Sequence, residues 1–147
     1  MSSSDDKLRR AKELGADETL NRTTVDVARF IRERTKKRGM DVIVDNVGTA
    51  TWGQSLLALG RRGRLVTCGA TSGPIVETDV RRLFWNQWSI LGSTMGNDEE
   101  FDAVVTELRE GHLPVTIDSV YPLEQGRSAF ERLASGEQFG KVVVRVS

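Results

Sequence analysis

The first forty residues carry apolar side chains at helical spacing. Leu8, Ala11 and Leu14 fall on one face of a predicted helix that Gly15 ends. A second helix is predicted from about Val25 until Gly39 stops it, with three side chains facing inward: Val27, Phe30 and Ile31. The chain therefore opens with two amphipathic helices.

Apolar segments rich in valine and isoleucine separate the later helices. Met40–Val47 (MDVIVDNV) is the clearest of them, and its composition is typical of a parallel strand that is buried on both faces. Four other segments predict strands: Arg64–Cys68, Ser89–Thr94, Val115–Val120 and Lys141–Val146. Thr19–Asn21 is a shorter strand candidate.

Further helices are predicted between these strands. The first has Thr49 as its cap, ends in Gly60 and Gly63, and carries Trp52, Leu56 and Leu59. The second has Thr78 as its cap and carries Val80, Leu83 and Phe84. Gly69–Pro74 between them is a loop by composition.

The last third of the chain predicts two more helices. One is strongly amphipathic, begins at Asn97 or Asp98, ends at Gly111, and carries Phe101, Val104, Val105 and Leu108 on one face. The other lies near Leu123–Ala134. Strands that alternate with helices of this length predict βαβ units and a parallel sheet. Right-handed crossovers then give a doubly wound α/β fold.

Composition excludes several classes of function. Lys plus Arg and Asp plus Glu both number 21, so charge gives no argument for a nucleic-acid or membrane partner. The densest basic run, Arg32–Arg38, is interpreted as a solvated helix end. One cysteine and one histidine predict no disulfide framework and no metal site. A polar N-terminus and the lack of a long apolar run predict a cytoplasmic protein.

Candidate chemistry lies where the strands end, because open α/β sheets bind ligands beyond the carboxyl ends of their strands. Three segments follow predicted strands and carry a glycine: Asp45–Gly48, Cys68–Ala70 and Ser93–Gly96. All three are predicted at one edge of the sheet, which favours a binding site over ordinary turns. For any single residue, both interpretations stay open.

Individual residues give weaker signals. Asp45 is a candidate base or ribose ligand, although capping of the next turn is an equal alternative. Cys68 is more typical of an inert small hydrophobe than of a reactive thiol. His112 follows a helix end, where the dipole favours an exposed imidazole. The three tryptophans, Trp52, Trp85 and Trp88, are predicted to serve packing.

Several longer segments resemble a known family. They are DKLRRAKELGAD with ETLN, DVIVDNVG, GRLVTCGATSG, RRLFWNQWSILGSTMG and the ending PLEQGRSAFERL…GKVVVRV. In order and spacing they resemble the C-terminal portion of medium-chain dehydrogenases, closest to the alcohol dehydrogenase-like and quinone oxidoreductase-like branches. The resemblance implies a Rossmann-type coenzyme domain in residues 1–95. It also implies a segment in residues 96–147 that returns to the catalytic domain.

The resemblance also implies which parts of the family's chain have no match here. Met1–Ser4 would be the tail of the second strand. The first strand, its glycine-rich turn and the upstream catalytic domain with the family's zinc ligands would be missing. We therefore expect no catalytic residue and no zinc site in this portion, and we expect the isolated chain to be inactive.

The resemblance implies a nicotinamide cofactor and the residues that would line its site. The serines Ser3 and Ser4, with Lys7 and Arg22, favour NADP over NAD, because no acid occupies the place that would repel a 2′-phosphate. Val47 and Gly48 would lie along the adenosine side. Cys68, Ala70, Ser93 and Met95 would face the nicotinamide carboxamide. The full expected set is Ser3, Ser4, Lys7, Arg22, Asn46, Val47, Gly48, Cys68, Gly69, Ala70, Ser93 and Met95.

Two other classes of function stay open at this point. One is a methyltransferase that uses S-adenosylmethionine, since DVIVDN also resembles strand ends of that fold. The other is a non-enzymatic module that assembles through sheet edges such as Ser89–Thr94, which would give a homodimer or a larger assembly. The expected ligands of the enzyme interpretation are a nicotinamide dinucleotide and a small-molecule substrate.

Overall fold

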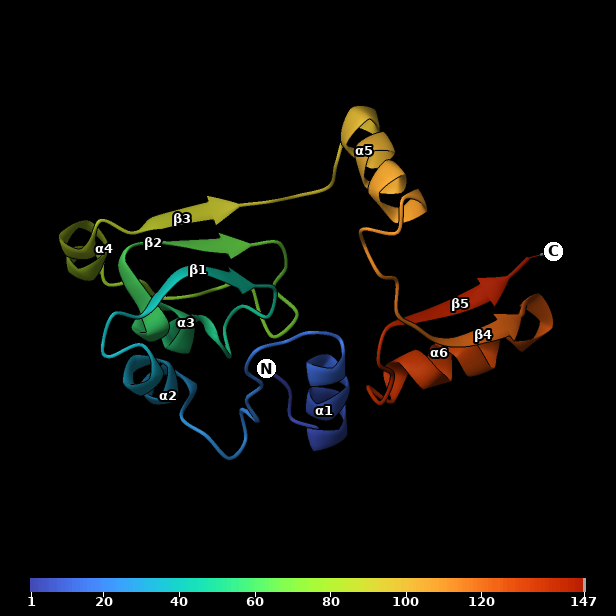
Figure 1. Ribbon diagram of the computed structural model, residues 1–147, viewed down its shortest axis with the longest axis horizontal. Coiled ribbons are helices and arrows are strands. Elements are labelled where there is room, and N and C mark those ends of the chain that lie inside the picture. Colours follow the sequence, from blue (N-terminus) through green and yellow to red (C-terminus); the bar gives the residue numbers. More distant parts are fainter. Residues whose placement is uncertain (147) are drawn as a thin grey trace. The chain divides into compact units, whose positions relative to one another are not determined.

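The computed structural model describes residues 1–146 and divides the chain into two compact units. The first unit is Met1–Met95, and the second begins at Gly96. Each unit has its own parallel sheet (Figure 1). The two units are described separately.

Three parallel strands form the sheet of the first unit. They are β1 (Met40–Asp45), β2 (Leu59–Thr67) and β3 (Ser89–Gly92), in the order β1-β2-β3. All three arrowheads point to the same edge of the sheet (Figure 1). The α/β fold and its parallel sheet, both predicted from the sequence, are thus confirmed.

Four helices accompany this sheet: α1 (Asp5–Glu13), α2 (Val27–Arg34), α3 (Trp52–Ala58) and α4 (Val80–Asn86). Helix α3 packs against β1 and β2, α2 packs against α3, and α4 contacts β2. Helix α3 therefore lies against two of the three strands, as Figure 1 shows.

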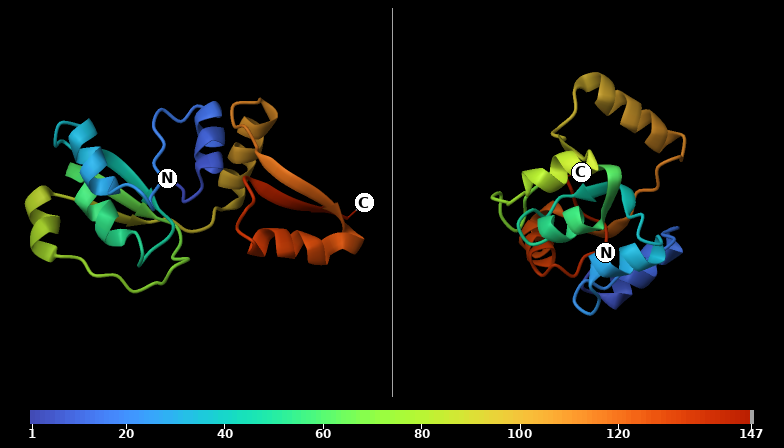
Figure 2. Two further views of the ribbon diagram at one scale, coloured as in Figure 1. Left: turned by 90° about the horizontal axis from the view of Figure 1, so that it is seen from below. Right: turned by 90° about the vertical axis from the view of Figure 1, so that its left-hand side faces the viewer.

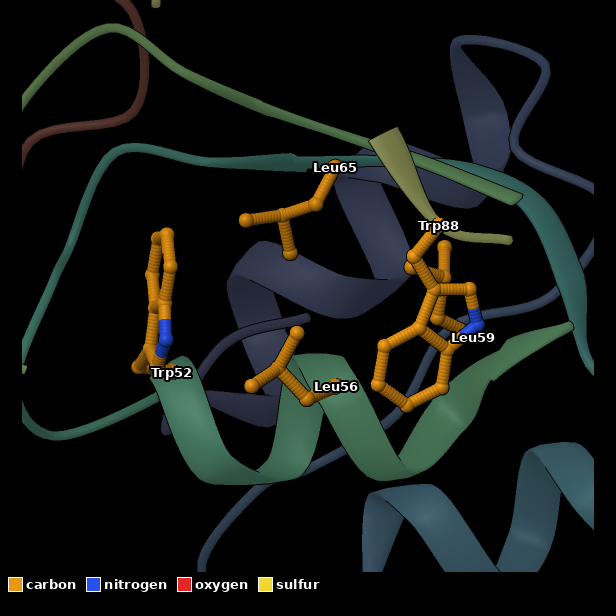
Figure 3. Packing of buried hydrophobic residues seen from close by; sticks show 5 residues of the cluster. All are labelled: Trp52, Leu56, Leu59, Leu65 and Trp88. Atoms are coloured by element: carbon orange, nitrogen blue, oxygen red, sulfur yellow. The ribbon is translucent and has the colours of Figure 1, made fainter. Parts of the chain in front are cut away.

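A cluster of five buried side chains holds α3 on the sheet. Its members, drawn in Figure 3, are Trp52, Leu56, Leu59, Leu65 and Trp88. Leu59 and Leu65 are fully enclosed. The two indoles also satisfy their polar atoms, because Trp52 donates to Thr78 Oγ1 at 3.0 Å and Trp88 donates to the Gly60 carbonyl at 2.8 Å. The packing role expected for Trp52 and Trp88 is confirmed.

The opposite face of the sheet is open, so the expectation that β1 is buried on both faces is wrong. Val42 and Val44 are 45% and 67% exposed, whereas Asp45 is buried. Val42 and Val44 therefore lie on the face of β1 that α3 does not cover. The strand has the composition of a doubly buried strand, but the described residues bury only one of its faces.

Several predicted boundaries and roles are also corrected. The N-cap position of α3 is Thr51, whose hydroxyl donates to Asp45 and accepts no helix N–H. The Thr49 hydroxyl, which was expected to cap the helix, donates to the Ile75 carbonyl. Asp79 caps α4, because the Thr78 hydroxyl accepts the Trp52 indole N–H. Helix α2 ends at Arg34, before Gly39, and β2 begins at Leu59, so Gly60 and Gly63 lie in a strand. Trp85 is 76% exposed and does not pack in the core.

The N-terminal segment contains a short piece of parallel pairing. Ser2 forms a parallel bridge with Asn21. Its N–H donates to the Leu20 carbonyl at 3.1 Å, and its carbonyl accepts the Arg22 N–H at 3.0 Å. Only this single bridge forms at the strand candidate Thr19–Asn21, next to the segment expected to be the tail of another strand.

The second unit pairs two parallel strands, β4 (Ile117–Pro122) and β5 (Lys141–Arg145). The short helix η1 (Leu123–Gln125) and helix α6 (Gly126–Ala134) connect them, and α6 lies along one face of the pair (Figure 2). Helix α5 (Asp98–Arg109) begins with a capping box between Asn97 and Glu100. None of the helices in residues 1–146 is long and apolar enough to cross a membrane.

One carboxylate links the elements of the second unit. Asp118 of β4 has a side chain that is 5% exposed and accepts two hydrogen bonds of 3.0 Å from the Arg132 guanidinium of α6. It also accepts the Phe139 N–H at 2.9 Å, just before β5. The bidentate bond from Arg132, with the Phe139 and Ser119 bonds, holds the pKa of Asp118 well below its usual range despite desolvation.

We predict that Asp118→Asn destabilises the second unit in a pH-dependent way. Because folding lowers the pKa of Asp118, its stabilising effect is present above the unfolded value of about 3.9 and is lost as pH falls through the folded value. The variant should unfold more readily than the parent at pH 7, and the difference should shrink in strong acid. Amide hydrogen exchange of β4 and β5 across pH measures it.

The matched control is Asp6→Asn, which removes an exposed ion pair with Arg9. That variant should leave exchange in the second unit unchanged at every pH. A gap between the Asp118→Asn variant and the parent that stays constant from pH 7 to pH 2 would contradict the assignment.

Candidate functional site

Three loops leave the sheet at the same edge, as the sequence predicts. Asn46–Gly48 follows β1, Cys68–Ala70 follows β2, and Ser93–Met95 follows β3. The first two loops are bonded to each other, because the Ser72 N–H donates to the Val47 carbonyl at 2.8 Å. The third is anchored where the Ser93 N–H donates to the Thr67 carbonyl at 2.9 Å. The structure thus places eight of the twelve expected site residues at one sheet edge.

The turn after β1 is organised by Asp45, which is 4% exposed. Its Oδ1 accepts the N–H groups of Val47 at 2.9 Å and Gly48 at 3.1 Å. Its Oδ2 accepts the hydroxyls of Ser55 at 2.7 Å and Thr51 at 2.8 Å. Of the roles weighed from the sequence, the geometry supports the cap of the turn, because the carboxylate is enclosed and its lone pairs are already used.

The charge state of Asp45 follows from these bonds. Burial by itself would raise the pKa of Asp45, but the bonds from Gly48, Ser55, Val47 and Thr51 favour the ionised form and lower the pKa overall. Asp45 is therefore a fixed anion at neutral pH and not a proton acceptor for a reaction.

Glycine is required in the first two loops because the loops touch one another. At Gly48, with φ of +87°, a Cβ would lie 2.4 Å from the Gly73 carbonyl oxygen and 3.2 Å from Ala70 Cα. At Gly69 a Cβ would lie 3.1 Å from the Asn46 carbonyl oxygen. The close approach that these two glycines permit is therefore between the loops themselves.

Sequence reasoning missed Ser72, which fastens these loops together. Its hydroxyl donates to the Val47 carbonyl at 2.7 Å and accepts the Ala50 N–H at 2.9 Å. With Asp45 below the turn, this leaves the Val47 carbonyl and the Val47 and Gly48 N–H groups engaged within the protein. In the sequence, Ser72 is a serine in a loop bounded by Gly69 and Gly73. Composition alone does not distinguish it from other serines in loops.

Polar backbone groups remain available further along the edge. Cys68, Ala70 and Ser93 are exposed, and Met95 is 96% exposed with φ of +41°. Within residues 1–146 the backbone N–H groups of Ala70 and Met95 donate no hydrogen bond. These are the groups that a carboxamide or phosphate oxygen at this edge can use.

The other four expected residues gather around the N-terminal bridge. Ser3 is exposed, and Ser4 caps α1 by accepting the Lys7 N–H at 3.4 Å. Arg22 follows the bridge and lines a pocket with a volume of about 460 Å³ beside β1. The two local acids are engaged, since Asp5 accepts from Asn21 at 2.7 Å and Asp6 pairs with Arg9 at 2.6 Å.

One cluster in the described residues has ligand atoms close enough for a metal ion. It consists of Glu107, Glu110 and His112, with His112 Nδ1 lying 3.1 Å from Glu107 Oε2 and 3.5 Å from Glu110 Oε2. All three side chains are exposed at the end of α5. The geometry equally suits hydrogen bonds between an exposed imidazole and two carboxylates.

Comparison with known proteins gives the family. A family model described as zinc-binding dehydrogenase matches residues 14–144. This chain belongs to that family. The resemblance to medium-chain alcohol dehydrogenases and quinone oxidoreductases is therefore confirmed, and with it the Rossmann-like character of the fold.

Similar proteins of this dehydrogenase family are much longer. A NAD-dependent alcohol dehydrogenase of Sulfolobus acidocaldarius is 30% identical over 98% of this chain and 41% of its own length. A quinone oxidoreductase of Pseudomonas aeruginosa is 30% identical over 97% and 46%. A crystal structure of a NAD-dependent alcohol dehydrogenase matches with a TM-score of 0.88 at 38% identity, over 98% and 42%. The chain spans less than half the length of these relatives.

Within residues 1–146 the groups able to bind zinc do not assemble a closed site. Zinc in proteins takes cysteine, histidine and carboxylate ligands in a tetrahedral shell supported by neighbouring groups. Cys68 lies in the first unit, in the loop after β2, and is not part of the cluster of ligand atoms at the end of α5. That cluster offers one histidine and two exposed carboxylates, which is a weak ligand set for zinc.

We predict that Asp45→Ala destabilises the first unit by about 3 kcal/mol, because it leaves two N–H groups and two hydroxyls without their charged acceptor. Tryptophan fluorescence during urea unfolding reports this loss, since Trp52 and Trp88 lie in the core of this unit. The control Asp41→Ala removes an exposed carboxylate of the same strand and should cost less than about 1 kcal/mol. Equal losses in the two variants would show that Asp45 does not organise the turn.

We also predict that the chain retains no zinc in a one-to-one ratio. Elemental analysis of protein purified without a histidine tag, after dialysis, should find well under one zinc per chain. Any loosely held metal should disappear in His112→Ala. One zinc that survives dialysis would refute this prediction.

Proposed function

We propose that this chain is the cofactor-binding portion of an NAD(P)-dependent oxidoreductase of the alcohol dehydrogenase or quinone oxidoreductase type. The observation that supports this best is the shared edge where the loops after β1, β2 and β3 meet, in a member of the dehydrogenase family. Parallel α/β sheets bind their ligands at that edge.

The bound cofactor would supply the hydride chemistry: NADPH would give a hydride to a carbonyl, enone or quinone substrate, and NADP⁺ would take one from an alcohol. The part of this chain is to bind and orient. Asp45 and Ser72 hold the first two loops together, so the Ala70 N–H has a defined place from which to donate to the carboxamide. The Met95 N–H would donate from the third loop, which Ser93 anchors to Thr67. We assign no catalytic residue to this chain.

We further propose NADP rather than NAD as the cofactor. Lys7 and Arg22 bring positive charge to the N-terminal bridge, and Ser3 leaves a hydroxyl exposed there. Of the two nearby acids, Asp6 has its charge offset by an ion pair with Arg9, and Asp5 accepts a hydrogen bond from the Asn21 amide. An arginine guanidinium suits a phosphate particularly well.

Three assignments complete the proposal. Residues up to 95 form part of the coenzyme domain, and residues from 96 belong with a catalytic domain. The protein acts in the cytoplasm. It associates with a second copy through open sheet edges such as β3, whose Leu91 is 45% exposed. The family match supports an oxidoreductase over a methyltransferase, and nothing in the geometry favours the methyltransferase.

We predict that replacing both Lys7 and Arg22 with alanine weakens NADPH binding about tenfold more than NADH binding, because a charge-assisted bond to phosphate is worth about 1.5–3 kcal/mol. The measurement is a titration followed by NMR shifts, which detects weak binding in the chain itself. The control is Lys12→Ala, which removes an exposed cation from the same helix α1. Equal losses for the two cofactors would contradict the choice of NADP.

We predict that the 147-residue chain by itself binds NADPH more weakly than micromolar, turns over no substrate and tends to self-associate. No G-x-G-x-x-G sequence occurs in it, so the pyrophosphate lacks the amides of such a turn. Calorimetric titration with light scattering measures affinity and mass together. Micromolar or tighter binding by a monomer would overturn this prediction, and binding undetectable by NMR at millimolar NADPH would count against the proposed function.

A further inference from the structure

The charges of the chain balance in total but are unevenly distributed. Residues 1–95 contain 16 Lys or Arg against 11 Asp or Glu, and residues 96–147 contain 5 against 10. The first unit therefore has an excess of five positive side chains. Several of them lie where β1, β2 and β3 begin, at the opposite end of the strands from the candidate site (Figure 1).

Five exposed cations surround these strand starts, and we call them the basic edge. They come from the turn after α2, the start of β2 and helix α4: Lys36, Lys37, Arg61, Arg62 and Arg82. Within residues 1–146 none of the five is bonded to a carboxylate. Arg62 donates to the side-chain oxygen of Gln87 at 3.0 Å, and Arg82 lies 5.4 Å from the centre of the Trp88 ring. Their charge is therefore available to a partner.

Close backbone contacts hold the three segments together. A Cβ on Gly39 would lie 2.7 Å from the Ala58 carbonyl oxygen and 2.8 Å from the Gly60 nitrogen, so the turn after α2 lies directly against the start of β2. The Trp88 indole donates to the Gly60 carbonyl at 2.8 Å, which places the end of α4 beside the same turn. Cations from three separate segments thus share one surface.

Arg32 compensates the helix ends at this surface. Helices α2 and α3 both end here, and the free carbonyls of a helix end carry partial negative charge. The Arg32 guanidinium donates to the carbonyls of Leu57 and Leu59 at 3.0 and 2.8 Å, and to that of Lys37 at 2.8 Å. The dipoles that would repel an anion are therefore offset.

The backbone at three of these cations is strained. Lys36, Lys37 and Arg62 have φ of 51°, 68° and 59°, in the left-handed region that side chains other than asparagine and aspartate mostly avoid. Three of the five non-glycine residues with positive φ in the described chain thus belong to the basic edge. Because strained residues cluster at functional sites, this favours a binding role for the charge over a solvated surface.

We propose that the basic edge binds the phosphate backbone of a nucleic acid, at a site separate from the cofactor edge. Adjacent strands are about 4.8 Å apart, so three strands present cations over roughly 10 Å. A strand of duplex DNA carries about one charge per 3.4 Å, which gives about three phosphates over that length. An extended acidic peptide offers about one carboxylate per 6.6 Å on one side, so its charge density matches the edge less well.

The test is a titration of the 147-residue chain into labelled duplex DNA, followed by fluorescence anisotropy at several salt concentrations. The dissociation constant should be about 10⁻⁴–10⁻⁶ M at physiological salt, and log K should fall against log salt with a slope of about −3 for three phosphates. A single strand of the same sequence should give a slope of about −2. The two slopes distinguish the two forms of nucleic acid.

The double variant Lys37→Asn with Arg62→Asn removes two cations of the basic edge. Asparagine adopts the left-handed backbone more readily than lysine or arginine, so the variant should fold at least as well as the parent. It should reduce the slope for duplex DNA by about 2 and weaken binding at least about tenfold. The matched control, Lys12→Gln with Arg127→Gln, removes two exposed cations from α1 and α6 and should leave the affinity within about twofold.

The experiment uses no nicotinamide, so its failure leaves the proposed function untouched. NADPH at matched ionic strength should not displace the DNA, and displacement would assign the DNA to the cofactor edge. Equal losses in the two double variants would reduce the binding to general charge. Equal affinity for polyglutamate of the same charge would assign the basic edge to an acidic protein. Any of these results, or no binding at low salt, would overturn the proposal.

Discussion

The buried carboxylate of Asp45 is the constraint on which the first unit depends. It is placed at the end of β1, where the chain must leave the sheet, turn and enter α3, and it accepts bonds from both the turn and the helix. Since α3 carries Trp52 and Leu56, the same anion orients the helix that supplies much of the core. The hydrogen bonds of the Asp45 carboxylate thus position both the first loop of the candidate site and the helix that packs on the sheet.

The second constraint is steric. Gly48 and Gly69 let the loops after β1 and β2 lie against each other, and Ser72 then bonds across the contact. This arrangement removes the Val47 and Gly48 backbone from the groups that a ligand can use, and it leaves the Ala70 and Met95 N–H groups available. Bonded backbone at Val47 and Gly48, beside available N–H groups at Ala70 and Met95, suits the proposed surface that orients a cofactor without reacting with it.

The sheet of the first unit has one exposed face and one unpaired edge, both at β1. Val42 and Val44 leave one face open, and the outer edge of β1 is unpaired within the described residues. The relatives are more than twice as long as the segment they share with this chain. In the second unit Asp118 of β4 bonds to Arg132 of α6 and to the Phe139 N–H just before β5, so an ion pair contributes to local stability beside apolar burial.

The sequence by itself determined the order and type of the elements, the parallel sheet, the family and the edge at which the site loops gather. Those features follow from periodicity and from residues that lie next to one another, such as MDVIVDNVG. Only the tertiary structure decided that Thr51 and Asp79 replace Thr49 and Thr78 at the helix starts, that Trp85 is exposed, and that Ser72 fastens two loops. Each of these depends on a partner more than twenty residues away or on which face of the sheet is covered. Local pattern carries no information about such distant contacts.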